Sequence, residues 1–191
     1  MEEKAKMILE HELWFADSLA LKILERPTLS VWMILIPVVF IYYFYRYKKF
    51  AEGKRDFAGN YMISRRQALA KAVEFVNGDN KADVSGIPAN IGLDGDTKSC
   101  YAELLFLLYD HYIRLLKSSG ATYRDLVKGA YGSSGEFTIF LNKLTRIEGR
   151  LNESFRKPDA SNDDFTSVIK SIGEYSETIR RTTIEKIYPA V

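Results

Sequence analysis

Few residues of this chain have the types and the spacing that catalysis or metal binding requires. Its 191 residues include one cysteine, Cys100, and two histidines, His11 and His111. These counts exclude an internal disulfide, a cysteine-rich zinc or iron–sulfur centre and a three-histidine zinc site. We therefore expect no metal and no cofactor.

Three short polar segments resemble ligand-binding loops but lack the required order of residues. The segment 79–83, Asp-Asn-Lys-Ala-Asp, has Lys81 at a ligand position of a calcium loop. In the segment 94–97, Asp-Gly-Asp-Thr, the order of glycine and aspartate is wrong for an aspartate nucleophile. The segment 132–135, Gly-Ser-Ser-Gly, lacks the lysine of a phosphate-binding loop. We interpret all three as turns or helix ends.

His111 is the titratable residue whose position invites a functional role. It belongs to a stripe of residues at helical spacing: Tyr101, Leu104, Leu108, His111 and Leu115. The stripe places the imidazole on or beside the core face of a helix. A carboxylate-bridged metal site would need paired Glu-x-x-His elements, which the sequence lacks. We interpret His111 as a hydrogen-bonded structural residue and Cys100 as a passive thiol, and we expect no enzyme.

Residues 29–45 form the one long apolar stretch without a charged residue. These 17 residues would make a helix of about 25 Å, near the lower limit for crossing a hydrocarbon core. Aromatic and basic side chains that favour the membrane interface mark its ends: Trp32, Tyr42, Tyr43, Tyr45, Arg46, Lys48 and Lys49. The sequence therefore predicts one transmembrane helix over residues 29–47.

Pro37 lies in the middle of this stretch and predicts a kink near residues 33–37. Two alternatives remain open for the stretch: a buried helix of a soluble core, and a re-entrant hairpin that turns at Pro37. Basic residues near the predicted span number four on its N-terminal side and eight on its C-terminal side. This asymmetry predicts a single-pass membrane protein with its C-terminal domain in the cytoplasm.

Residues 1–28 are predicted to form an amphipathic helix that ends before the span. Its apolar arc includes Ile8, Leu13, Phe15 and Leu19, and Glu12 is the main charged residue within that arc. The opposite face is rich in acidic residues, which favours a protein partner over an anionic lipid surface. We expect the four apolar side chains, together with Pro37 in the span, to dock onto a partner. The alternative is a helix that lies passively on the bilayer.

Residues 48–191 are predicted to form a helical domain. A juxtamembrane linker is expected after the span, and helical periodicity then marks segments at 57–76, 99–120, 122–131, 133–157 and 161–188, with a long loop over 77–99. Thr97 or Ser99 is expected to cap the segment 99–120, and Thr122 with Asp125 predicts a capping box at the start of 122–131. The segment 133–157 has an apolar stripe at spacings of three and four: Phe137, Phe140, Leu144, Ile147, Leu151 and Phe155.

The segment 99–120 is apolar on all sides near residues 104–109, which predicts a central helix. No alternating strand pattern is present. We expect an all-α protein: an N-terminal amphipathic helix, one transmembrane helix and an antiparallel four-helix-type bundle that closes without residues 1–47.

No family signature stands out, and composition narrows the function only in part. A net charge of +2 and the lack of a basic–aromatic platform exclude nucleic-acid binding. The leading hypothesis is a non-catalytic accessory or scaffold subunit that docks onto an integral-membrane protein complex, with that complex and the lipid bilayer as partners. No small-molecule substrate is identified. The alternative is a membrane-anchored ligand-binding or sensory bundle, with a pocket near the loop 77–99 and His111.

Overall fold

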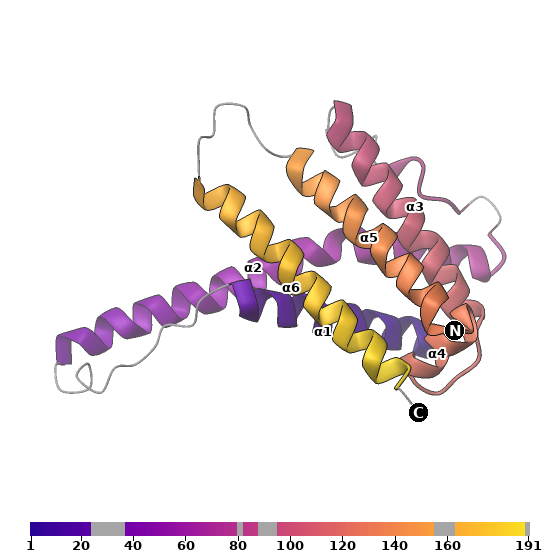
Figure 1. The fold of residues 1–191 in the computed structure, drawn as a ribbon, viewed down its shortest axis with the longest axis horizontal. Helices are drawn as coiled ribbons and strands as arrows, with labels where there is room; N and C mark the ends of the chain where they lie inside the picture. The colour runs from indigo at the N-terminus through magenta and orange to yellow at the C-terminus, as the bar shows by residue number, and fades with distance from the viewer. Residues whose placement is uncertain (24–36, 80–81, 88–94, 155–162, 190–191) are drawn as a thin grey trace.

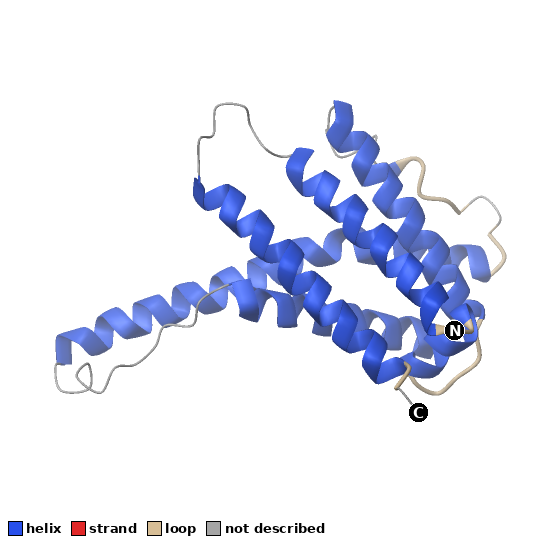
Figure 2. Cartoon of the chain, in the orientation of Figure 1, coloured by secondary structure: helices blue, strands red, loops and turns tan. Residues whose placement is uncertain are grey.

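The computed structural model describes residues 1–23, 37–79, 82–87, 95–154 and 163–189, and describes side chains outside 37–50 and 163–168. Within these ranges there are six helices and no strand (Figures 1 and 2). They are α1 (Glu2–Ile23), α2 (Pro37–Val76), α3 (Gly95–Lys117), α4 (Tyr123–Tyr131), α5 (Ser134–Ser154) and α6 (Asp163–Ile187). The predicted all-α class is confirmed.

Helix α2 is continuous over 40 residues, which corresponds to about 60 Å. Pro37 is its first described residue, because residues 24–36 lie outside the description. Its N-terminal part projects away from the other helices, and its C-terminal part crosses the bundle (Figure 1). The linker expected between the span and the helix 57–76 is instead helical, because residues 48–56 contain no proline to interrupt α2.

The predicted membrane span is only partly covered by the structure. Residues 29–36, which include Trp32 and most of the predicted kink, lie outside the described residues, whereas residues 37–45 belong to α2. The side chains of the other expected interface anchors, from Tyr42 to Lys49, are also outside the description. Among the helices that are described, none has both the length and the apolar character needed to cross a membrane.

Helix α1 packs into the bundle, which differs from the separate N-terminal helix that we expected. Ile8 belongs to the main core, and Phe15 and Leu19 pack with Ile179 of α6. Of the four side chains expected to dock onto a partner, these three are buried within the chain itself, and only Leu13 is exposed, at 41%. The apolar arc of α1 is used for intramolecular packing because α2, α3 and α6 surround it.

The central position of α3 is confirmed. Its side chains Leu104, Leu105, Leu108, Tyr112 and Leu115 are almost completely buried. The apolar stripe predicted on α5 is also buried over the described residues: Phe137, Phe140, Leu144, Ile147 and Leu151. These stripes face each other in one contiguous core.

Helix ends follow local sequence signals in most places. Thr122 and Asp125 form the predicted capping box at the start of α4, and Gly132 ends that helix with φ of 70°. Helix α6 ends at Ile187, before Tyr188 and Pro189 as expected. Thr97 does not cap α3, because it lies inside the helix and donates a hydrogen bond to the carbonyl of Ser154.

Candidate functional site

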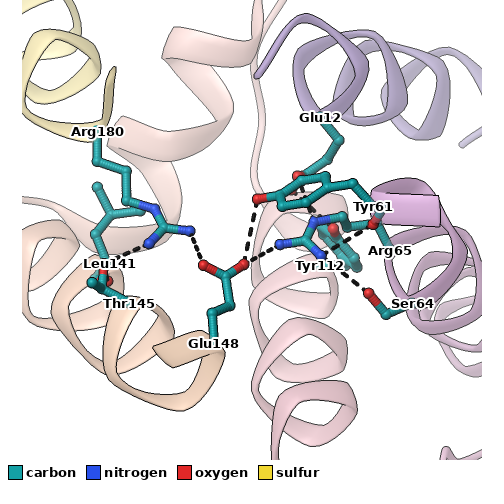
Figure 3. Close-up of polar contacts among 9 residues, drawn as sticks. All are labelled: Glu12, Tyr61, Ser64, Arg65, Tyr112, Leu141, Thr145, Glu148 and Arg180. Carbon is teal, nitrogen blue, oxygen red and sulfur yellow. Dashed lines mark hydrogen bonds and ion pairs between the residues drawn. The ribbon is translucent and has the colours of Figure 1, made fainter. Parts of the chain in front are cut away.

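Four charged side chains from four helices meet inside the bundle (Figure 3). Glu12 comes from α1, Arg65 from α2, Glu148 from α5 and Arg180 from α6. The two arginines are only 2% and 5% exposed. Burying charges is costly unless they are paired and hydrogen-bonded. The contacts among these four side chains, here called the charged network, therefore determine whether their charges are compensated.

Glu148 joins the two arginines. Its Oε1 accepts hydrogen bonds from Arg65 Nη2 and from the Tyr61 hydroxyl, the latter at 3.3 Å. Its Oε2 accepts a hydrogen bond from Arg180 Nη2 at 2.5 Å. Arg180 also donates from Nη1 to the Thr145 hydroxyl at 2.5 Å. Both carboxylate oxygens of Glu148 are therefore occupied by cationic donors.

Arg65 is held from several sides. Its Nη1 donates to the Tyr61 carbonyl at 3.2 Å and to the Ser64 hydroxyl at 3.1 Å, and its guanidinium lies 3.5 Å from the centroid of the Tyr61 ring. Its Nε lies 3.4 Å from Glu12 Oε2, an ion pair without a hydrogen bond, since Nε has no hydrogen-bond partner among the described residues. Glu12 in turn accepts a hydrogen bond from the Tyr112 hydroxyl at 2.9 Å.

The surroundings shift the pKa values of the two carboxylates in opposite directions. Burial alone would raise the pKa of Glu148, but Arg180 and Arg65 outweigh burial and lower it. For Glu12, burial dominates over the attraction of Arg65, and the pKa is raised. Burial opposes the charge of Arg65 and Arg180, yet Tyr61 and Glu148 hold both pKa values above the ordinary value. With all four groups ionised, two positive and two negative charges cancel.

A cavity of about 470 Å³ lies beside this network, between α2, α3, α5 and α6. Arg65, Glu148 and Arg180 form part of its wall. Apolar and aromatic side chains make up much of the remainder: Phe57, Tyr61, Ile63, Tyr101, Leu104, Leu151, Ile169 and Ile172. A volume of this size, with a largely apolar lining and a few convergent polar groups, is typical of small-molecule sites.

Two glycines in helix interiors also line the cavity. Gly149 lies in α5 and Gly173 in α6, and a Cβ atom built on either would meet nothing within 4 Å. A glycine inside a helix destabilises it by roughly 0.5–1 kcal/mol relative to alanine. Close packing does not explain this cost at either position, whereas the missing side chains keep the cavity wide.

His111 lies outside the cavity wall and has the contacts of a structural residue. Its ring stacks on Phe140 at a centroid distance of 4.1 Å, and its Nδ1 lies 2.6 Å from the Tyr131 hydroxyl. Burial lowers the pKa of His111 to about 3, so the imidazole is neutral at physiological pH. Cys100 is buried, with Arg150 Nη2 at 3.5 Å from its sulfur. Among the described residues no cluster of three or more metal-binding side chains occurs.

The charged network was not predicted from the sequence, and only one of its members gave a signal. Glu12 is a charged residue within the apolar arc of α1, and its burial now has an explanation in Arg65 and Tyr112. Arg65, Glu148 and Arg180 lie beside apolar positions of their helices and look like ordinary polar residues in isolation.

Comparisons with other proteins leave the function to be argued from this geometry. No protein-family model matches the chain, and searches of curated proteins and of solved structures found no similar protein.

Proposed function

We propose that this protein is a membrane-anchored helical bundle that binds an apolar small molecule in the cavity between α2, α3, α5 and α6. The observation that carries the proposal is the largely apolar cavity with a preorganised wall of buried arginines. Arg65 and Arg180 are fixed in place by Glu148, Thr145 and Ser64, so a ligand meets donors whose orientation is already set. Preorganised polar groups in an apolar pocket favour binding because little side-chain entropy remains to be lost.

The membrane anchor in this proposal is the apolar stretch 29–45, and α2 supports its link to the cavity. Residues 37–45 of the stretch continue into α2 without a break, and Phe57 and Tyr61 of the same helix line the cavity. Phe57 follows Tyr47 by ten residues, or about 15 Å of helix. A molecule dissolved in the bilayer would therefore be close to the cavity, with the bundle on the cytoplasmic side as the basic residues indicate.

The accessory-subunit hypothesis shares this anchor but loses the docking surface that it assigned to α1. It relied on the apolar face of α1, and Ile8, Phe15 and Leu19 are buried in the chain's own core. The remaining exposed pair on α1, Leu13 and Trp14, is small, and isolated apolar residues are common on protein surfaces. We therefore place ligand binding first.

Photoaffinity labelling tests the proposal. The full-length chain in lipid nanodiscs is irradiated with a long-chain alcohol that carries a diazirine, and labelled peptides are identified by mass spectrometry. We expect labels on cavity residues such as Ile63, Tyr101 and Asn152. The double variant Gly149→Leu/Gly173→Leu should lose most of this labelling, because the new side chains occupy the cavity.

The matched control is Gly149→Ala/Gly173→Ala, which adds one methyl group per site and should keep the labelling. Equal cavity labelling in the leucine and alanine variants, or labels confined to other surfaces, would contradict the binding function. Resistance of the full-length chain to carbonate extraction tests the anchor separately, and its release from membranes would remove that part of the proposal.

A further inference from the structure

The charged wall of the cavity has more hydrogen-bond donors than the described residues accept. A guanidinium group has five N–H donors. For Arg180, the described hydrogen bonds are those to Thr145 and Glu148. The Thr145 hydroxyl is itself used twice, since it also donates to the carbonyl of Leu141. Arg65 Nε also lacks a hydrogen-bond partner among the described residues, but it is fully enclosed and lies 3.4 Å from Glu12 Oε2, so it is not available to a ligand. The remaining N–H groups of Arg180 therefore favour a ligand atom that accepts hydrogen bonds.

The charges already present in the wall determine whether that acceptor is charged or neutral. With Glu12 and Glu148 ionised, they compensate Arg65 and Arg180 through three ion pairs across helices. An additional carboxylate or phosphate in the cavity would give the buried cluster a net negative charge without a counter-charge. Such a charge is strongly unfavourable away from water. An uncharged acceptor uses the free donors and leaves the balance intact.

The rest of the cavity lining is largely apolar and can pack against a hydrocarbon chain. Phe57, Ile63, Leu104, Leu151 and Ile172 come from α2, α3, α5 and α6 and line the cavity together with the arginines. The lining thus offers donors to a polar head and apolar surface to a hydrocarbon body.

We propose that the ligand is an amphipathic molecule with an uncharged carbonyl-type acceptor as its head, such as an ester, a ketone or a quinone, bound by Arg180. This inference rests on the proposed binding function and adds the chemical class of the ligand. It excludes free fatty acids and phospholipid phosphates as the preferred occupants.

Competition between two probes of equal chain length tests the class. Methyl dodecanoate and dodecanoate each compete with the diazirine alcohol for wild-type protein in nanodiscs at neutral pH, with concentrations corrected for partitioning into protein-free discs. We expect the ester to protect the cavity peptides at a concentration about tenfold lower than the carboxylate. Dodecane, which lacks an acceptor, should protect less well than the ester.

A charge variant gives a second test that a purely apolar cavity would not pass. Glu12→Gln removes one negative charge and retains an oxygen that accepts from Tyr112. The network then has a net positive charge, which favours the carboxylate. The ratio of the protecting concentrations of carboxylate and ester should therefore fall from about tenfold to about threefold or less. Glu103→Gln, at an exposed ion pair with Arg150, should leave the preference unchanged.

The outcomes separate the two proposals. Equal or better protection by dodecanoate in the wild type would overturn the uncharged head while cavity binding stands. The same would follow if Glu12→Gln folds and leaves the ester preference unchanged. Absence of cavity labelling by the diazirine alcohol would overturn both proposals.

Discussion

At the residue scale, Glu148 determines whether the two buried arginines are compensated. Replacing it with glutamine leaves Arg65 and Arg180 without their shared carboxylate. We expect Glu148→Gln to lower the free energy of unfolding by about 3–5 kcal/mol, because an uncompensated buried charge remains. Urea denaturation followed by circular dichroism measures this change.

The matched control is Glu103→Gln, which removes an ion pair to Arg150 whose side chains are about half exposed. Exposed pairs of this kind contribute about 0–1 kcal/mol. If both variants lose the same small amount, the buried network does not have the energetic role that its geometry indicates.

His111 makes the stability of the protein depend on pH. Its folded pKa is about 3, below the ordinary value of 6.5. Between these values the unfolded chain binds the proton and the folded chain does not, so the free energy of unfolding falls as the pH falls. In His111→Gln the slope of this free energy against pH should be smaller by up to about 1.4 kcal/mol per pH unit.

Urea titrations at a series of pH values between these limits measure the slope. His11, whose pKa burial lowers to about 4, contributes with the same sign and remains in the variant. A slope unchanged by His111→Gln would show that His111 titrates normally in the folded protein.

At the scale of the helices, the glycines of α5 and α6 widen the cavity at a cost in stability. Gly149→Ala and Gly173→Ala should each raise the free energy of unfolding by about 0.5–1 kcal/mol, since the added Cβ meets nothing within 4 Å. Gly132→Ala should lower it, because φ of 70° at the end of α4 is strained for alanine. Thermal melts compare the three variants, and destabilisation by Gly149→Ala would mean that α5 packs more tightly there.

The helices were predictable to the extent that their signals are local. The capping box of Thr122 and Asp125 and the buried stripe of α5 were expected from spacing alone. The partner of the α1 apolar face was not, because an amphipathic pattern identifies a buried face without identifying what covers it. The charged network was missed for a similar reason. Its members are distant in sequence, and only the fold brings Glu12 to Arg65 and Glu148 to Arg180.

At the scale of the whole molecule, α1 is part of the bundle and not an appendage. Ile8, Phe15 and Leu19 are each buried, and burial of such a side chain contributes about 1.5–3 kcal/mol. A fragment of residues 50–191 lacks these contacts. It also lacks Glu12, so Arg65 loses one of its ion pairs. We expect it to unfold without a cooperative transition, in contrast to the full-length chain, as followed by circular dichroism. A cooperative melt of the fragment at a temperature near that of the intact protein would contradict this and show that the bundle folds without α1.

Native mass spectrometry of the full-length protein released from nanodiscs measures whether the cavity holds a ligand. We expect a bound small molecule on the wild type and on Gly149→Ala/Gly173→Ala, and its loss from Gly149→Leu/Gly173→Leu. The bare protein mass in all three samples, or the same bound mass in all three, would contradict a ligand in the cavity between α2, α3, α5 and α6.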